Sequence, residues 1–268
     1  MADLHLFGGE KGGVGKSIVC RAVIQYLLDH GLDFVAFDTD RSNPDIWRIY
    51  GKVLDCQLGI FSEGERYEDT ANAIFNAALK KRTIVNLPAQ VLIPIKAWFE
   101  ANDLLEIAAD TGVNFVFWFV SDGGFDSINL LKKTLEYFKD GVRYVVVKNL
   151  GKADDWEAFD QDKDLQQLMQ KYNTTIIEFP KFIGSVVRNR IDSESLPFNS
   201  CRSRKPQSAG DNFKGKNHAS IQEAASESPL IIGATEHPDF GVIDRQRVKK
   251  FLREAYASFE AVEVFTHC

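Results

Sequence analysis

The chain has 268 residues and a formal net charge of −6 at pH 7. Hydrophobic residues make up 44% and charged residues 26% of it, a composition typical of water-soluble proteins with a packed core. The length suits one α/β domain or two small ones. The acidic balance argues against a surface that coats nucleic acid over its whole extent, although it allows a local basic patch.

The apolar runs and the cysteines further limit the class of protein that this chain can belong to. The longest apolar run, residues 115–120, is too short to span a bilayer, and the first apolar segment follows no basic or signal-like stretch. The cysteines Cys20, Cys56, Cys201 and Cys268 are scattered, without the close spacing of a metal or redox motif. We therefore expect a cytoplasmic protein with reduced thiols.

Strand and helix patterns alternate over the first two thirds of the chain. Apolar segments predict strands at residues 4–8, 34–38, 83–87, 114–120, 144–148 and 175–179. Helical periodicity falls between them, at about 16–29, 68–80, 95–109, 126–138 and 155–171. This alternation favours a three-layer α/β/α fold, with a mostly parallel sheet between two layers of helices. Ligands are then expected at the carboxyl ends of the strands.

The pattern changes after about residue 193. Residues 199–228 are mainly polar and predict a surface excursion. Apolar residues recur at helical spacing within 242–262, so this segment predicts a helix with one face packed on the body. Because an element follows the excursion, we expect residues 1–268 to form a single domain.

The most specific motif lies between the first strand and the first helix, where the chain reads Gly-Gly-Glu-Lys-Gly-Gly-Val-Gly-Lys-Ser. Gly12, Gly13 and Gly15 lack the Cβ atom that would block the approach of an anion to the backbone amides. Lys16 adds a positive charge for the β- and γ-phosphates, and the Ser17 hydroxyl can bind Mg²⁺. The helix that begins here directs its positive end to the same place. The motif predicts a nucleotide-binding protein.

A second lysine distinguishes this loop from a plain phosphate-binding loop. Lys11 precedes the glycines, and Glu10 stands where the plain motif has glycine. The stretch Lys-Gly-Gly-Val-Gly-Lys-Ser resembles the deviant P-loop of the ParA/MinD family. That resemblance implies the P-loop NTPase fold and a homodimer in the ATP state, in which Lys11 contacts the phosphates bound by the partner subunit. The loop residues it implies for nucleotide binding are Lys11, Gly12, Gly13, Val14, Gly15, Lys16, Ser17 and Ile18.

Two carboxylates follow the second predicted strand, at Asp38 and Asp40. The matching Asp-x-Asp of the family implies that Asp40 positions the attacking water, while Asp38 and Ser17 support Mg²⁺. Together with Lys11 and Lys16, Asp40 is then a catalytic residue. The residue pattern alone leaves a second role open for Asp40, as the N-cap of a helix that starts near Asn43-Pro44-Asp45.

The next predicted strand departs from the family pattern. It ends in Asn86, where the family has aspartate. An amide can hydrogen-bond a metal-bound water but brings no negative charge to Mg²⁺, so we expect slow hydrolysis.

Two further residues suggest that the base is adenine. Asn149 ends an apolar strand and Pro180 follows the next one, at positions that resemble the adenine pocket of the family. Asparagine after a strand is also a common turn residue. The guanine-reading pattern Asn-Lys-x-Asp is absent, since the chain continues Asn-Leu-Gly-Lys. The expected cofactors are therefore ATP and Mg²⁺.

Basic residues form two clusters in the last third of the chain. They are Arg202, Arg204, Lys205, Lys214 and Lys216 in the excursion, and Arg245, Arg247, Lys249, Lys250 and Arg253 in the last helix. We interpret the helix as a packing helix with a solvated basic face rather than as a membrane anchor. Nonspecific DNA binding by a dimer stays open.

Short matches resemble one branch of the family, the plasmid mobilisation and conjugal-transfer ATPases of TraL/MobD type. They are Phe37-Asp38-Thr39-Asp40 with Asn43, Val120-Ser121-Asp122-Gly123-Gly124, and Arg245-Gln246-Arg247. The resemblance implies a weakly hydrolysing dimerisation switch that positions a plasmid or another large cargo with a cognate partner protein. Two alternatives remain. One is an adaptor that binds ATP without hydrolysing it, which Asn86 favours. The other is an ATP-dependent ligase or amidotransferase, a class that usually lacks the second lysine.

Overall fold

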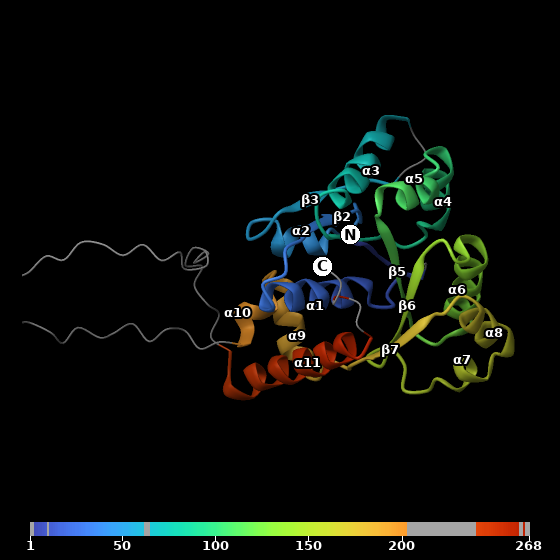
Figure 1. Ribbon diagram of the computed structural model, residues 1–268. Helices are drawn as coiled ribbons and strands as arrows, with labels where there is room; N and C mark the ends of the chain where they lie inside the picture. The colour runs from blue at the N-terminus through green and yellow to red at the C-terminus, as the bar shows by residue number, and fades with distance from the viewer. Residues whose placement is uncertain (1–2, 10, 62–64, 203–239, 263–264, 266–268) are drawn as a thin grey trace, which may run out of the picture.

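The computed structural model describes residues 3–9, 11–61, 65–202, 240–262 and 265. Within them, seven strands form one sheet in the order β3-β2-β4-β1-β5-β6-β7 (Figure 1), and all the pairings are parallel. The strands are β1 Asp3–Gly8, β2 Val35–Asp38, β3 Cys56–Leu58, β4 Thr83–Asn86, β5 Asn114–Ser121, β6 Arg143–Asn149 and β7 Thr175–Phe179. The predicted parallel sheet is confirmed, and it gains the short edge strand β3.

Helices cover both faces of this sheet and complete the predicted α/β/α layers. One layer, with its own hydrophobic cluster, comprises α1 Lys16–Asp29, α2 Asp45–Tyr50, α9 Ser185–Ser193, α10 Phe198–Arg202 and α11 Val242–Glu260. The other layer comprises α3 Glu65–Ala78, α4 Leu92–Ala101, α5 Leu104–Thr111, α6 Phe125–Phe138, α7 Glu157–Gln161 and α8 Lys163–Lys171.

Strand β5 shows why both faces of the sheet are buried. Its side chains alternate in direction, as the pleat requires. Phe115, Phe117 and Phe119 belong to the cluster under α3–α8, while Trp118 and Val120 belong to the cluster under α1 and α11. An almost continuous apolar run is the expected sequence of such a doubly covered parallel strand.

Two predicted helices are each split in the structure. The segment predicted at 95–109 forms α4 and α5, which are separated at Asp103, a residue with a φ of 46° that interrupts the right-handed helix. The segment predicted at 155–171 forms α7 and α8. Asp162 separates them because its carboxylate accepts a hydrogen bond from the Leu165 amide and so caps α8.

The predicted polar excursion begins later than expected. Phe198 and Cys201 are buried in α10, so residues 199–202 belong to the packed body. The rest of the excursion, residues 203–228, lies outside the described residues. The last helix packs as predicted, with Val248, Phe251 and Leu252 in the core. No helix among the described residues is long and apolar enough to cross a membrane.

The sheet order places the loop after β1 at the centre of the molecule. Strand β4 lies between β1 and β2, so the first two strands of the chain are neighbours only across β4. The chain continues from β1 to β2, which lies on the β4 side of β1. Strand β5 pairs with β1 on the opposite side. Such a reversal point is where parallel α/β sheets bind ligands.

Candidate nucleotide-binding site

The glycine-rich loop between β1 and α1 is fixed by contacts with neighbouring strands. Gly15, which precedes α1, has a φ of 100°, and a Cβ atom there would lie 2.3 Å from Asn149 Nδ2. Asn149 Nδ2 in turn donates to the Val14 carbonyl at 2.8 Å. Val14 itself is buried. The end of β6 therefore holds the loop in place from below, and only glycine fits at position 15.

A cavity of about 540 Å³ opens over this loop, within the usual size of small-ligand sites. It brings together predicted residues from four segments of the chain: Gly12, Gly13, Gly15, Lys16, Ser17, Ile18, Asp40, Asn149 and Pro180. Three predicted residues do not line the cavity. Val14 lies beneath the loop, Lys11 turns toward Asp122, and Asp38 is enclosed by the loop that follows it.

Lys16 sits at the start of α1 as a nearly buried cation. Its side chain folds over the loop, and Nζ donates to the Lys11 carbonyl at 3.2 Å. Backbone amides of a glycine loop, a helix N-terminus and a lysine together form a strong anion site.

Lys11 forms an ion pair within its own chain. Its Nζ lies 2.8 Å from Asp122 Oδ2, in the loop after β5, and the lysine side chain remains 39% exposed. The hydrogen bond from Lys11 to Asp122 and the charge of the carboxylate raise the pKa of Lys11. Burial alone would raise the pKa of Asp122, but the bonds from Lys11 and the Gly124 amide bring it below its usual value.

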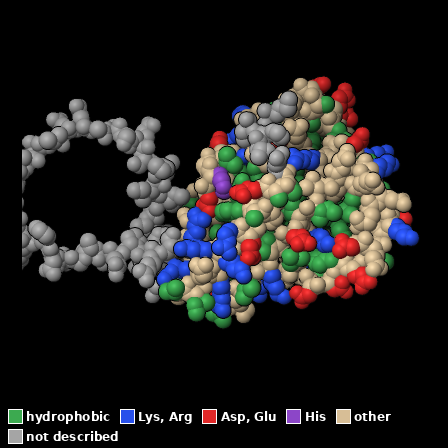
Figure 2. All heavy atoms as spheres, turned by 60° about the horizontal axis from the view of Figure 1, so that its bottom comes forward, with side chains coloured by type: hydrophobic (Ala, Val, Ile, Leu, Met, Phe, Trp, Pro, Cys, Tyr) green, Lys and Arg blue, Asp and Glu red, His purple; other side chains and the backbone are tan. Residues whose placement is uncertain are grey.

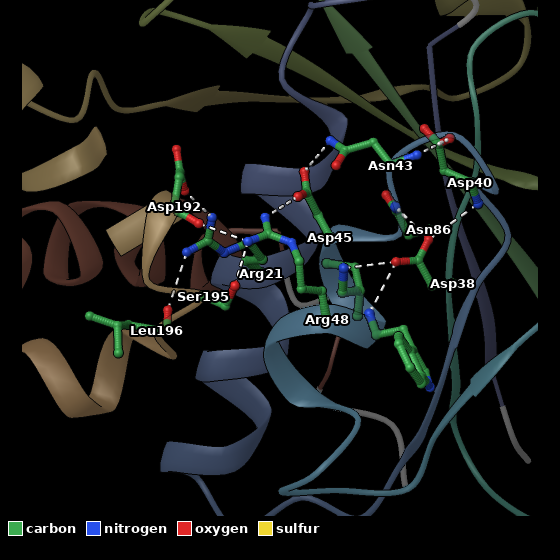
Figure 3. Close-up of polar contacts among 12 residues, drawn as sticks. Arg21, Asp38, Asp40, Asn43, Asp45, Arg48, Asn86, Asp192, Ser195 and Leu196 are labelled. Carbon is green, nitrogen blue, oxygen red and sulfur yellow. Dashed lines mark hydrogen bonds and ion pairs between the residues drawn. The ribbon is translucent and has the colours of Figure 1, made fainter. Parts of the chain in front are cut away.

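Asp38 is fully buried at the end of β2, and both of its oxygens are engaged (Figure 3). Oδ2 accepts from the amides of Ile46 at 2.7 Å and Trp47 at 3.1 Å. Oδ1 accepts from the Asp40 amide at 3.2 Å and from Asn86 Nδ2 at 3.0 Å. Burial raises the pKa of Asp38, and these four bonds oppose it only in part. Asp38 thus caps α2, and its predicted support of Mg²⁺ has no open oxygen in this arrangement.

Asp40 has a more open position on the cavity wall. Its Oδ1 accepts from the amides of Ser42 at 3.0 Å and Asn43 at 3.1 Å, which shapes the turn before α2. It does not cap α2, because Asp38 binds the first-turn amides. Of the two roles the sequence left open for Asp40, the N-cap is therefore wrong.

The residues near the loop fit a magnesium ion bound together with a phosphate. Asn86 Oδ1 is buried and has no hydrogen-bond partner among the described residues, so it can accept one more hydrogen bond, although Asn86 does not line the cavity. The Ser17 hydroxyl and Asp40 do line it. No group of three or more histidine, cysteine or acidic side chains suited to a metal occurs in the described part of the chain. Mg²⁺ commonly binds through few protein ligands, with phosphate and water completing its shell.

The cavity is also lined by Asn149, Phe179 and Pro180, where the sequence predicts the base. Besides its bond to Val14, Asn149 accepts from the Gly151 amide at 3.0 Å through Oδ1. One amide hydrogen and one lone pair of Asn149 are left for a ligand. Its predicted role in reading adenine stays a prediction, and its role in holding the loop is new.

Sequence reasoning missed a polar chain that joins the Asp40 turn to α9 (Figure 3). Asn43 Nδ2 donates to Asp45 at 2.9 Å, and Arg48 donates to Asp45 at 2.6 Å and to the Asp192 carbonyl at 2.8 Å. Arg21, on α1, donates to the Asp192 carboxylate at 2.6 Å. The available sequence signal was Arg21 itself, an arginine inside the apolar face of the first helix.

Comparison with known proteins finds some that are similar to this chain in sequence. No family model matches the chain. It is 26% identical over 185 residues to Protein MobD of Acidithiobacillus ferrooxidans, which covers 69% of this chain and 80% of MobD. It is also 28% identical over 127 residues to Protein TraL of Escherichia coli, which covers 46% of this chain and 52% of TraL.

Besides these sequence similarities, the chain has a loop with two lysines at the end of a central parallel strand. Through this loop the sequence of the chain resembles the ParA/MinD family of P-loop ATPases. Among solved structures it is similar to the MinD cell division protein of Aquifex aeolicus, with a TM-score of 0.46 and 15% identity over 74% of this chain and 89% of that one. It is also similar to the McdA(D38A)–ATP complex of Cyanothece, with a TM-score of 0.38 and 11% identity over 74% and 89%.

A basic face lies beside the last helix. Lys and Arg side chains gather over the region of α10 and α11 (Figure 2). Lys249 and Arg253 are exposed there and, with Arg202, line a shallow groove of about 370 Å³. The apolar side of α11 is buried, as the interpretation of a packing helix with a solvated basic face requires.

Proposed function

We propose that this protein is an ATP-dependent dimerisation switch with slow ATPase activity. The observation that carries the proposal is the loop with two lysines of unlike environment. Lys16 is buried and lines the cavity, whereas Lys11 is part-exposed, does not line the cavity and pairs with Asp122. In the proposed switch, Lys16 binds the phosphates of its own nucleotide, and Lys11 contacts those of a second subunit.

In the proposed ATP state, the amides of Gly12, Gly13 and Gly15 bind the triphosphate, and Lys16 neutralises part of its charge. Mg²⁺, coordinated by Ser17 and phosphate oxygens, would add positive charge where the leaving group develops negative charge. Asp40, on the cavity wall, orients the attacking water.

Slow turnover follows from the surroundings of Asp38. Among the described residues its only side-chain partner is Asn86, which is neutral and donates to it. The site therefore contains fewer negative charges to hold a metal ion than a pair of carboxylates would supply. Release of the γ-phosphate would end the contact of Lys11 and dissociate the dimer.

The cellular role is proposed from the relatives. Similarity to proteins named MobD and TraL supports a cytoplasmic role in plasmid mobilisation or partition, with a cognate partner protein. The basic groove beside α11 supports nonspecific DNA binding by the dimer, through phosphate contacts of Lys249 and Arg253. Such binding should weaken steeply as salt is raised.

Mass in solution tests the switch directly. With Mg²⁺ and ATP the mass should double, while ADP or no nucleotide should leave a monomer. Lys11→Ala should abolish the dimer and keep most ATP binding, whereas Lys16→Ala should weaken ATP binding itself. Equal masses in all three states would refute the proposed dimer.

A single-turnover assay separates the switch from an adaptor that never hydrolyses ATP. Enzyme in excess over labelled ATP should release phosphate slowly but completely, and Asp40→Asn should stop the release. A dimer that forms with ATP but releases no phosphate would support the adaptor instead.

A further inference from the structure

Asp192 is the one acidic residue of α9 that lines the nucleotide cavity. It lies near the end of α9, far in sequence from the phosphate-binding loop. Its Oδ1 accepts from Arg21 Nη1 at 2.6 Å. Within the described residues its Oδ2 accepts no hydrogen bond, and the side chain is 50% exposed. A carboxylate oxygen is thus available to a ligand in the cavity.

The carboxylate is held in position from several sides. The Arg21 side chain is only 5% exposed, its guanidinium lies 4.8 Å from the Phe198 ring centroid, and Nη2 donates to the Leu196 carbonyl at 3.4 Å. Arg48 Nη1 donates to the Asp192 carbonyl at 2.8 Å. Both the side chain and the backbone of Asp192 are therefore fixed before any ligand enters, which is the condition for a specific contact.

The position along the cavity indicates which part of a nucleotide Asp192 meets. In the proposed ATP complex, Lys16 and Ser17 bind the phosphates and Asn149 and Pro180 bind the base, and all four line the same cavity as Asp192. Arg21 follows Ser17 by four residues on α1, about one helical turn, so its partner Asp192 is separated from the residues proposed to bind the phosphates. In any nucleotide the part between phosphates and base is the sugar.

The chemistry agrees with the position. An ionised carboxylate only accepts hydrogen bonds, so it repels phosphate and pairs with hydroxyl donors. The ribose 2′- and 3′-hydroxyls are the donors between phosphate and base, and an acidic residue on a ribose hydroxyl recurs in dinucleotide-binding folds. We propose that Asp192, positioned by Arg21, accepts a hydrogen bond from a ribose hydroxyl and makes the site select ribonucleotides over deoxyribonucleotides. This inference rests on the proposed ATP binding.

Calorimetry with Mg²⁺ and three nucleotides tests the inference. The nucleotides are ATP, 2′-deoxy-ATP and 3′-deoxy-ATP. The wild-type chain should bind at least one deoxy form about tenfold more weakly than ATP, the effect of one lost hydrogen bond to a charged group. In Asp192→Ala this preference should fall below about threefold, and Asp192→Asn should show an intermediate ratio. The ratio, unlike the affinity, is insensitive to a general loosening of α9.

Glu194→Gln is the matched control. Glu194 lies two residues away and pairs with Arg190 at 2.7 Å, but it does not line the cavity, so the variant should keep the wild-type preference. Equal binding of all three nucleotides by the wild type would overturn the inference and leave the proposed function intact. A preference that survives in Asp192→Ala would also overturn it. Absence of ATP binding would overturn both. Should Asp192→Ala fail to fold, the wild-type ratio and Asp192→Asn still decide.

Discussion

Lys11 and Asp122 lie 2.8 Å apart although 111 positions separate them in the chain. The lysine proposed to reach a second subunit is thus already paired within its own. Asp122 is the more buried partner and is further fixed by the Gly124 amide, which donates to its Oδ1 at 3.1 Å. A contact of Lys11 with phosphates across a dimer would compete with this ion pair.

Asp122→Asn should therefore ease dimerisation. The variant keeps the shape of Asp122 but removes the charge that holds Lys11, so the ATP concentration for half-maximal dimer should fall about two- to fivefold, the effect of a part-exposed ion pair. Sedimentation across an ATP titration measures it. Asp126→Asn, which removes an exposed carboxylate near Lys11, is the control and should shift the midpoint less. An unchanged midpoint for Asp122→Asn would contradict a restraining role of the pair.

Asn86→Asp should make stability depend on pH. The new carboxylate would face Asp38 at the 3.0 Å contact now made by the amide, and a like charge raises the pKa of a buried carboxyl further. The pair then binds a proton in the folded state that the unfolded chain releases. The free energy of unfolding should be about 1–3 kcal/mol lower than wild type near neutral pH. That deficit should shrink as the pH falls toward the ordinary carboxyl range.

Urea titrations at several pH values measure this dependence. The wild type should show the same direction of pH dependence. Burial raises the pKa of Asp38, so ionisation of its carboxyl lowers the free energy of unfolding above that pKa. With Mg²⁺ and ATP, Asn86→Asp should also speed single-turnover hydrolysis. A deficit of equal size at all pH values would show that repulsion between the two carboxylates is not its cause.

Gly15→Ala should damage the loop even without a nucleotide. Its Cβ atom would lie 2.3 Å from Asn149 Nδ2, and a φ of 100° is unfavourable for alanine. The Asn149–Val14 hydrogen bond should be lost, and stability should fall by about 1–3 kcal/mol. Chemical unfolding measures the loss. Gly12→Ala is the control, since no atom lies within 4 Å of a Cβ there, and it should unfold like the wild type.

Phe251→Ala should show that α11 belongs to the core. Phe251 is 2% exposed and stacks on Phe182 with ring centroids 4.7 Å apart. Its truncation should cost about 3–5 kcal/mol of stability. Phe125→Ala, at a phenylalanine that is 79% exposed, should cost little and serves as the control. Equal unfolding midpoints for both variants would mean that α11 contributes nothing to the folded body.

The predictions that succeeded from sequence are those carried by neighbouring residues. The loop from Gly12 to Ser17 is one contiguous segment, and it lies between a strand and a helix as predicted. Its role as an anion site stays a prediction. The parallel sheet follows from the spacing of apolar segments. The edge strand β3 was missed because three residues are too few to show a period.

Tertiary structure decided how the polar residues are used. Asp38 was expected beside a metal ion, but the fold brings the amides of α2 and the side chain of Asn86 onto its oxygens. Lys11 meets Asp122, and Arg21 meets Asp192 across 171 positions. The sequence alone determines the charge and size of each side chain. It does not show the hydrogen-bond partner, because strand order and helix packing determine which distant residues come within hydrogen-bonding distance.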